Sequence, residues 1–300
     1  MSDAQQPERC GYVAFVGRPN VGKSTLLNRL IGQKVSITSS RPQTTRHVLL
    51  GIRTEGRDQV VFVDTPGLHS GGKRALNRAM NRAARSVFMD VDVVCMVVEA
   101  LRWTEEDSRV LELLSQARGK RFLVVNKADR ARPRTRLLPF LQSCAQRADF
   151  DELVPLSALK GENVDALGGC IRSALPEAPH LFEADEFTDR SARFLVAEIV
   201  REKLMRRLGD ELPHQLAVAV DRWHEADDAL EIHLSVLVER EGQRAIVIGQ
   251  GGQRLKEVGT EARREIEALL ETHVRLELWV KVRGGWSDDD RMLRQLGLTE

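Results

Sequence analysis

A run of eight residues near the start of the chain has the composition of a phosphate-binding loop. Its glycines let backbone N–H groups surround a phosphate chain, and the helix expected after it directs its positive end to the same point. Lys23 would reach the β and γ phosphates, and the Ser24 hydroxyl would bind Mg²⁺. The run is Gly17-Arg18-Pro19-Asn20-Val21-Gly22-Lys23-Ser24, and Thr25 continues it. These residues predict a nucleoside triphosphate with Mg²⁺ as the ligand.

An acidic residue later in the chain fits the metal side of such a site. Asp64 comes forty residues after Ser24 and is followed by Thr65-Pro66-Gly67. A nucleotide-binding fold needs a carboxylate near the metal and a glycine N–H near the γ phosphate. An Asp-x-x-Gly pattern alone is weak evidence, but its distance from the phosphate loop supports these roles for Asp64 and Gly67.

Four residues that follow another apolar run select the base. The run Phe122-Leu123-Val124-Val125 leads into Asn126-Lys127-Ala128-Asp129. The Asp129 carboxylate can accept hydrogen bonds from N1–H and N2–H₂ of guanine, whereas adenine offers no such pair of donors, and a site of this kind discriminates by roughly 10⁴-fold. The segment Ser157-Ala158-Leu159 fits the remaining backbone contact to the guanine oxygen. We therefore predict GTP and GDP as ligands.

The elements that position these motifs follow from the apolar pattern. Runs rich in β-branched residues cover 13–16, 60–63, 93–98 and 122–125, and stretches of helical length separate most of them. Such runs are typical of buried strands in a parallel sheet. We predict a three-layer α/β domain with a mostly parallel sheet over residues 1–176.

The second half of the chain has a different pattern. Two prolines and an acidic segment predict a linker over 177–190. Beyond it we expect a helix over 194–208, alternating strands at 216–220 and 232–238, a helix over 255–270 and a last strand at 274–280. These elements predict a smaller α+β domain over residues 191–300. Trp279 and Trp286 could stack on bases, but a tryptophan in an alternating strand more often lies in the core, and we expect this of Trp279.

A glycine-rich loop precedes the last helix of this domain. Gly-x-x-Gly loops let a nucleic-acid backbone approach closely while unstacked bases lie in a neighbouring apolar groove. Residues 246–248 before the loop fit either a strand or a short helix, and a lone Gly-x-x-Gly is more often a structural turn. The candidate RNA-binding residues are Ile248, Gly249, Gln250, Gly251, Gly252, Arg254 and Lys256.

Charge, cysteines and hydropathy exclude several classes of protein. The net charge of +1 divides into +8 for residues 1–180 and −7 for residues 181–300. RNA binding by the second half would therefore rest on a local patch, because its bulk charge is negative. The four cysteines are scattered without zinc-ligand spacing. No run of apolar residues reaches the ~18 residues that are needed to span a membrane. The first residues of the chain also lack the basic and then apolar layout of a signal peptide, so we expect a cytoplasmic protein.

The nucleotide motifs resemble the translation-factor class of P-loop GTPases. The resemblance implies that residues 42–46 form the first switch, with Thr45, or alternatively Thr44, as a ligand of Mg²⁺. Leu68 stands where many GTPases carry a catalytic glutamine. The resemblance places the chain in a subgroup in which an asparagine matching Asn20 helps hold K⁺ near the phosphates. Lys23, Asn20, Thr45 and Gly67 are the implied catalytic residues, and slow hydrolysis stimulated by K⁺ is the implied activity.

The chain as a whole resembles the Era family, in which a GTPase domain precedes a K-homology domain of the second type. The match rests on Gln43-Thr44-Thr45-Arg46-His47, on the Gly249 loop, and on residues 276–282 with Gly285-Trp286. It implies GTP-dependent binding to the 3′ region of 16S ribosomal RNA during assembly of the 30S subunit. The loop departs from the usual pattern, because Gln250-Gly251 supplies no basic residue between the outer glycines.

Two alternatives come from other classes. The first is a regulatory GTPase whose second domain docks on a membrane or a protein. The second is a GTPase partner of an RNA-modifying enzyme. Basic residues after the second switch form a face that is solvated or contacts either RNA or the anionic inner surface of the cytoplasmic membrane; they are Lys73, Arg74, Arg78, Arg82 and Arg85.

Overall fold

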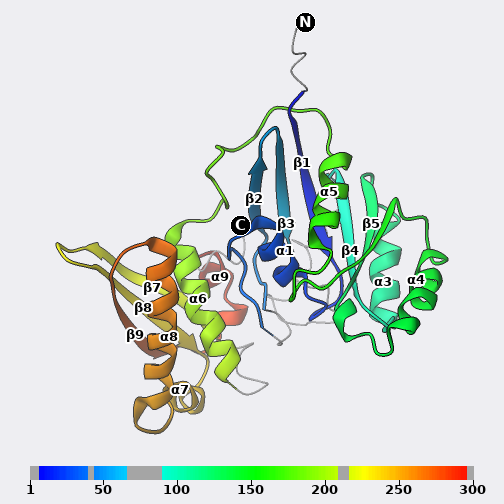
Figure 1. Ribbon diagram of the computed structural model, residues 1–300. Coiled ribbons are helices and arrows are strands. Elements are labelled where there is room, and N and C mark those ends of the chain that lie inside the picture. The colour runs from blue at the N-terminus through cyan, green and yellow to red at the C-terminus, as the bar shows by residue number, and fades with distance from the viewer. Residues whose placement is uncertain (1–6, 40–43, 66–89, 209–215, 296–300) are drawn as a thin grey trace, which may run out of the picture. The chain divides into compact units, whose positions relative to one another are not determined.

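The computed structural model describes residues 7–39, 44–65, 90–208 and 216–295, which form two compact units (Figure 1). The described part of the first unit consists of residues 7–36, 45–65 and 90–189. The second consists of residues 190–208 and 216–295 together with 37–39 and Thr44. A short piece of the first half of the sequence thus packs with the second unit.

The first unit is built on a six-stranded sheet of order β2-β3-β1-β4-β5-β6. All neighbouring strands run parallel except β2 and β3, which form an antiparallel pair. The strands are β1 Arg9–Val16, β2 Leu49–Glu55, β3 Asp58–Asp64, β4 Val93–Glu99, β5 Lys120–Asn126 and β6 Glu152–Pro155. The helices are α1 Lys23–Ile31, α3 Glu105–Leu114, α4 Leu137–Ala145 and α5 Val164–Ala174. The predicted mostly parallel sheet is confirmed, and β2 is an edge strand that the apolar pattern missed.

Side chains of β1 alternate between two apolar cores, one on each face of the sheet. Phe15 packs in a cluster with Leu26 of α1. Its neighbour Val16 belongs to the opposite cluster, which contains Leu114 of α3 and Cys144 of α4. Because successive strand residues point to opposite faces, the continuous apolar runs of the sequence require helices on both sides. This arrangement confirms the three-layer prediction.

The segment predicted as a linker runs along the antiparallel end of the first sheet. The Gln59 side chain accepts hydrogen bonds from the N–H groups of Leu181 and Phe182 at 2.8 and 3.0 Å. Thr188 then forms a bridge with Gly51 of β2, and its hydroxyl donates to the carbonyl of Leu50 at 2.7 Å. Residues 177–189 therefore extend the first unit, and the second resumes at Arg190.

The second unit has a three-stranded sheet of order β7-β8-β9. The β7 and β8 strands are antiparallel, and β8 and β9 are parallel. Its elements are α6 Ala192–Arg207, β7 Leu216–Glu225, β8 Leu230–Val238, α7 Glu241–Ile248, α8 Gln253–Leu270, β9 Val274–Val282 and α9 Asp290–Gln295. The small α+β fold is confirmed, and residues 246–248 belong to a helix. None of the helices within the described ranges is long and apolar enough to span a bilayer.

The two late tryptophans lie in opposite environments. Trp286 is fully buried, whereas the prediction that Trp279 lies in the core is wrong, because 59% of its surface is exposed. The cause is the alternation of side chains between the two faces of a strand. Leu276, Leu278 and Val280 pack against the core of the unit. Trp279 falls between them and therefore points to the opposite face of the sheet.

Candidate nucleotide site and nucleic-acid groove

The phosphate loop connects the end of β1 to the start of α1, and two of its glycines are sterically required. Gly17 has φ +150°, and a Cβ there would lie 2.4 Å from the carbonyl oxygen of Val97. Gly22 has φ +101°, and a Cβ there would lie 2.3 Å from Nδ2 of Asn126. No larger residue fits either place without displacing the ends of β4 or β5. The loop is therefore held against the edge of the sheet where the other motifs also lie.

Lys23 occupies the centre of the loop. Its ammonium donates hydrogen bonds to the carbonyl oxygens of Gly17 and Arg18 at 2.9 and 3.2 Å. Burial lowers the Lys23 pKa to about 8, with the Asp64 charge acting against this and the Arg18 charge adding to it. A phosphate anion at this point would stabilise the charged lysine. The first turn of α1 has neither a side-chain cap at Gly22 nor an acidic residue, so its N–H groups face the same region.

Asp64 gathers three hydroxyl groups around one of its oxygens. Its Oδ2 accepts hydrogen bonds from Ser24, Ser36 and Thr45 at 3.0, 2.6 and 3.3 Å. Its Oδ1 is buried and has no partner among the described residues. Burial raises the Asp64 pKa, and the hydrogen bond from Ser36 and the Lys23 charge oppose this. Hydroxyl and carboxylate oxygens are the ligands that Mg²⁺ prefers, so this set fits that ion.

The two adjacent threonines of the first switch have different surroundings. The Thr45 hydroxyl lies 3.0 Å from that of Ser24, on the metal side of the loop. The Thr44 hydroxyl instead lies 2.9 Å from that of Ser39. The geometry thus favours Thr45 as the metal ligand. Ser36 was not foreseen, because it belongs to no motif and reaches Asp64 only through the fold.

Asn126 joins three segments of the site. Its Nδ2 donates to the carbonyl oxygen of Val21 at 2.8 Å. Its Oδ1 accepts hydrogen bonds from the N–H groups of Lys127 and Ala158 at 2.7 and 3.0 Å. The side chain is buried, so these bonds fix the phosphate loop to both base-reading segments. Asp129 is half-buried and makes no hydrogen bond or ion pair within the described chain, which leaves its carboxylate available to a base.

The predicted loop at residues 157–159 lies beside Asn126, with two residues buried and one exposed. Ser157 and Ala158 are buried, whereas Leu159 is 68% exposed. The Ser157 N–H donates to the carbonyl of Glu162 at 3.0 Å. Since Asn126 already engages the Ala158 N–H, the Leu159 N–H is the one in this triplet with no partner among the described residues.

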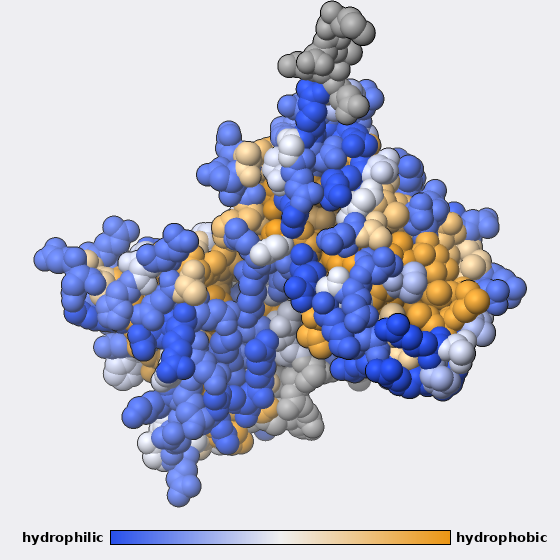
Figure 2. Space-filling view, viewed as in Figure 1, coloured by the Kyte–Doolittle hydropathy of each residue, from blue (hydrophilic) through white to orange (hydrophobic). Residues whose placement is uncertain are grey.

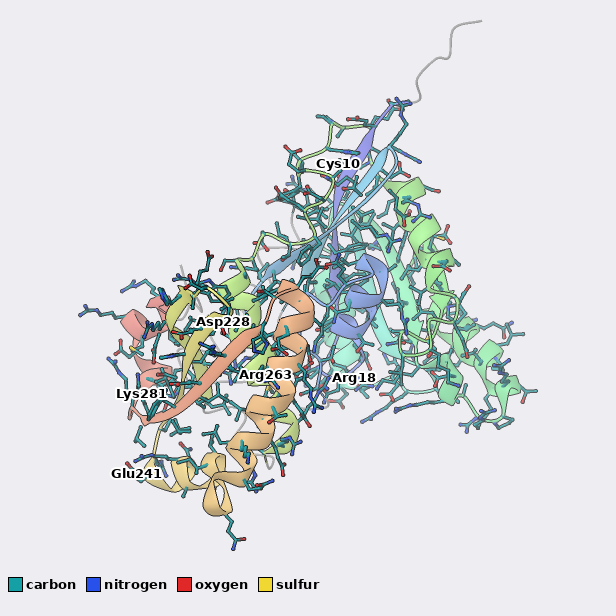
Figure 3. All side chains as sticks on the ribbon, turned by 60° about the vertical axis from the view of Figure 1, so that its left-hand side comes forward. Cys10, Arg18, Asp228, Glu241, Arg263 and Lys281 are labelled. Carbon is teal, nitrogen blue, oxygen red and sulfur yellow. The ribbon has the colours of Figure 1, made fainter. Side chains whose placement is uncertain are left out.

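The side chain of Arg18, labelled in Figure 3, forms ion pairs with two carboxylates. Its guanidinium contacts Glu99 at 3.0 Å and the fully buried Asp107 at 3.3 Å. Lys127 contacts the other oxygen of Glu99 at 3.2 Å. Although burial would raise the Glu99 pKa, hydrogen bonds from Arg18 and Lys127 lower it. Neither Glu99 nor Asp107 carries a sequence signal, since both act from elements distant in the chain.

The remaining nucleotide residues are placed as follows. Pro19 and Thr25 are partly buried, and Asn20 is exposed with φ +64°. Several predictions lie outside the described residues: they concern Gly67, Leu68, Pro42, Gln43 and the basic positions between 73 and 85.

The glycine-rich loop of the second unit lies between α7 and α8 as the one-turn helix η4 Gln250–Gly252. Gly249 has φ +74°, and a Cβ there would lie 2.7 Å from Cβ of Arg254. Gly251 and Gly252 also have positive φ, but the space around them is open. The Arg254 guanidinium donates to the carbonyl of Ile246 and so braces the loop. Gln250 and Lys256 are exposed.

A groove of about 410 Å³ runs from this loop between α8 and β9. Its lining combines apolar and basic residues: Gly252, Leu255, Lys256, Gly259, Thr260, Arg263, Leu276 and Leu278. Arg263, labelled on α8 in Figure 3, is paired with Glu267 at 2.9 Å. Lys256 has no ion pair within the described residues. Most of these residues were missed, because β9 brings its leucines to the loop from twenty residues further along the chain.

Comparisons with known proteins match both units of the chain. A family model described as 50S ribosome-binding GTPase matches residues 12–127, and a KH domain model matches residues 211–287. The GTPase Era of Azotobacter vinelandii is 55% identical over 289 residues, which is 96% of each chain. The chain belongs to the GTPase Era family. The GTPase Era of Pseudomonas aeruginosa strain UCBPP-PA14 is 54% identical over 98% of this chain and 97% of its own length. The predicted family, the GTPase activity and guanine-nucleotide binding are thereby confirmed.

Two solved structures match this Era-family chain over nearly its whole length. One is Era in complex with MgGDPNP and nucleotides 1506–1542 of 16S ribosomal RNA, with a TM-score of 0.94, 38% identity, and coverage of 98% of this chain and 100% of that chain. The other is a variant of Aquifex aeolicus Era bound to GDP and AlF₄⁻, with a TM-score of 0.94, 39% identity, and coverage of 97% and 100%. The two-domain GTPase–KH fold is therefore shared with both.

Proposed function

We propose that this chain is a cytoplasmic GTP-hydrolysing switch that binds the 3′ region of 16S ribosomal RNA and assists assembly of the 30S subunit. The observation that carries the proposal is the presence, in one chain, of the guanine-nucleotide motifs and a KH domain with a groove. A relative with the same two-domain fold, 38% identical, has been solved with MgGDPNP and nucleotides 1506–1542 of 16S ribosomal RNA.

The nucleotide would be held by contacts at both ends. The phosphates meet the Lys23 ammonium and the uncapped N–H groups of α1, and guanine meets the Asp129 carboxylate. Ser24, Thr45 and the unpartnered Oδ1 of Asp64 are positioned to hold Mg²⁺. Mg²⁺ held by these oxygens would neutralise negative charge on the phosphates.

Hydrolysis would be slow in the isolated protein. Leu68 follows Gly67 in the sequence, and its side chain cannot orient a water molecule. Asn20 lies exposed in the phosphate loop, where its side-chain oxygen is available to K⁺. We expect faster GTP hydrolysis in K⁺ than in Na⁺ buffer, and this difference should disappear in Asn20→Ala. Equal rates in the two buffers for the wild type would contradict the potassium part of the proposal.

The RNA groove would bind single-stranded bases more than bulk phosphate charge. Its floor contains Leu255, Leu276 and Leu278, and the open glycines at 251 and 252 allow a backbone to approach. Lys256 and Arg263 supply limited positive charge at its side. Specific contacts to base edges would therefore provide most of the selectivity.

Nucleotide state would reach the second unit through residues 36–45. Ser36 and Thr45 hydrogen-bond to Asp64, whereas residues 37–39 and Thr44 between them belong to the second unit. There the Thr38 N–H donates to Oε1 of the buried Glu202 of α6 at 2.8 Å. Metal and γ-phosphate contacts that order Thr45 would therefore act on a segment bound to α6.

Crosslinking to cellular RNA tests the RNA part directly. Purified protein is loaded with a non-hydrolysable GTP analogue or with GDP, irradiated with total RNA, and the crosslinked sites are sequenced. We expect enrichment at the 3′ end of 16S RNA in the GTP-analogue form and its loss in Gly252→Asp. Gly242→Asp adds the same charge at an open position in α7 and should bind normally. Equal crosslinking in both nucleotide states would contradict a nucleotide-controlled switch.

Association with the 30S subunit and with the inner membrane surface are separate predictions. Co-sedimentation with purified 30S subunits tests the first. Flotation with anionic phosphatidylglycerol vesicles tests the second, which rests on the basic positions between 73 and 85. Vesicle binding without any RNA binding would instead favour the membrane-docking alternative.

A further inference from the structure

Helix α4 carries more apolar surface than its packing uses. Cys144 is buried, and Leu137, Phe140 and Leu141 are half-buried against the core on that face of the sheet, which leaves part of their apolar surface open. Leu138 is 64% exposed. Figure 2 shows hydrophobic residues gathered on the surface over α4, toward the right of the view. Exposed apolar area of this kind on a folded domain is typical of an interaction surface.

The apolar surface of α4 borders a hollow of about 370 Å³. Leucines of α4 form one wall, and Pro155 and Leu156 at the end of β6 form another. Ala128 and Ser157 close it, and the Ala128 N–H donates to the carbonyl of Leu156 at 3.0 Å. The surface is therefore a groove that can receive the side chains of a partner helix.

The segment that leads into α4 is positively charged. Arg130, Arg132, Arg134 and Arg136 alternate just before α4, and all four are exposed. No ion pair of these arginines occurs within the described chain, and Arg134 lines the hollow. Glu162 is the carboxylate in the lining, and it lies 4.0 Å from the ammonium of Lys160. Other arginines of the same unit, such as Arg18, are neutralised by carboxylates.

We propose that this groove, lined by α4, the end of β6 and Arg134, is the docking site of an acidic amphipathic helix from a partner protein. Apolar side chains on one face of that helix would fill the hollow, and carboxylates at its edges would pair with the arginines. A single-stranded nucleic acid fits less well, since the described lining offers no aromatic side chain for base stacking. A bilayer surface fits less well because the apolar area is concave.

Photo-crosslinking in cells tests the proposal. The photoreactive amino acid p-benzoylphenylalanine replaces Leu138 in the full-length protein expressed from its own gene, and crosslinked material is mapped by mass spectrometry. We expect a protein segment with apolar residues at helical spacing and an excess of Asp and Glu. The same substitution at Leu181, which is 55% exposed elsewhere on the unit, is the control. Crosslinks to RNA, to lipid, to a second copy of the chain, or to nothing would overturn the proposal.

A synthetic peptide of the crosslinked segment then tests the role of charge. Its binding is measured by fluorescence anisotropy with the triple variant Arg132→Ser, Arg134→Ser, Arg136→Ser. We expect affinity to fall by about tenfold or more, and the wild-type affinity to fall with added salt. The control triple variant removes the exposed charges of Arg57, Arg102 and Arg118. Equal loss in both triple variants, or none in either, would overturn the proposal, while GTP hydrolysis should be unchanged in both.

Discussion

Replacement of Asn126 by alanine should separate the phosphate loop from the base-reading segments. The substitution leaves the buried carbonyl of Val21 and the buried N–H of Ala158 without partners. Each buried polar group without a partner costs about 1–3 kcal/mol. The Lys127 N–H is only partly buried, so water can replace its bond. We therefore expect a loss of about 2–6 kcal/mol in the free energy of unfolding of the nucleotide-free first unit.

Urea unfolding followed by circular dichroism measures this loss, and titration with fluorescent GDP measures the effect on the site. We expect the GDP affinity to fall by at least about tenfold. A less well preorganised site loses binding free energy, and a loss of about 1.4 kcal/mol corresponds to a tenfold lower affinity. Asn163→Gly is the matched control. Asn163 has φ +60° and a single exposed bond to the carbonyl of Pro155, so glycine suits its conformation. If Asn126→Ala unfolded at the same urea concentration as this control, the three bonds of Asn126 would not stabilise the site.

Further predictions concern individual positions. Gly22→Ala should abolish tight GTP binding, because a Cβ would lie 2.3 Å from Asn126. The control Gly169→Ala, at an open position in α5, should bind GTP normally. Equal GTP affinities of the two variants would contradict the steric argument. Burial lowers the Lys23 pKa to about 8 in the folded protein. Above that pH the unfolded state therefore binds more protons than the folded state. The nucleotide-free wild type should thus gain stability relative to Lys23→Met from about pH 8 to pH 10.5, and parallel pH profiles would refute this. Trp279→Ser should change the free energy of unfolding by less than about 1 kcal/mol, whereas Trp286→Ser should lower it by about 3 kcal/mol or more; similar denaturation midpoints would argue against their opposite burial.

The sequence predicted the local parts of the nucleotide site because each depends on a short run of residues. Gly17 and Gly22 have a backbone conformation that favours glycine, and Asn126 is the last residue of the strand that positions it. The β-branched runs likewise predicted the interior strands of the sheet. The edge strand β2 was missed, since a strand exposed along one side lacks a continuous apolar run.

Tertiary structure alone decided which distant residues complete these local motifs. Ser36 reaches Asp64 across 28 positions of sequence, and Arg18 reaches Asp107 across 89. The RNA groove requires β9 beside α8, and the exposure of Trp279 depends on the face of the sheet to which its strand position points. The sequence by itself determined the guanine nucleotide and the family, because their motifs are contiguous. Only the fold decided the place of Ser36 beside Asp64, the RNA groove and the groove beside α4, because packing brings residues together that no local pattern relates.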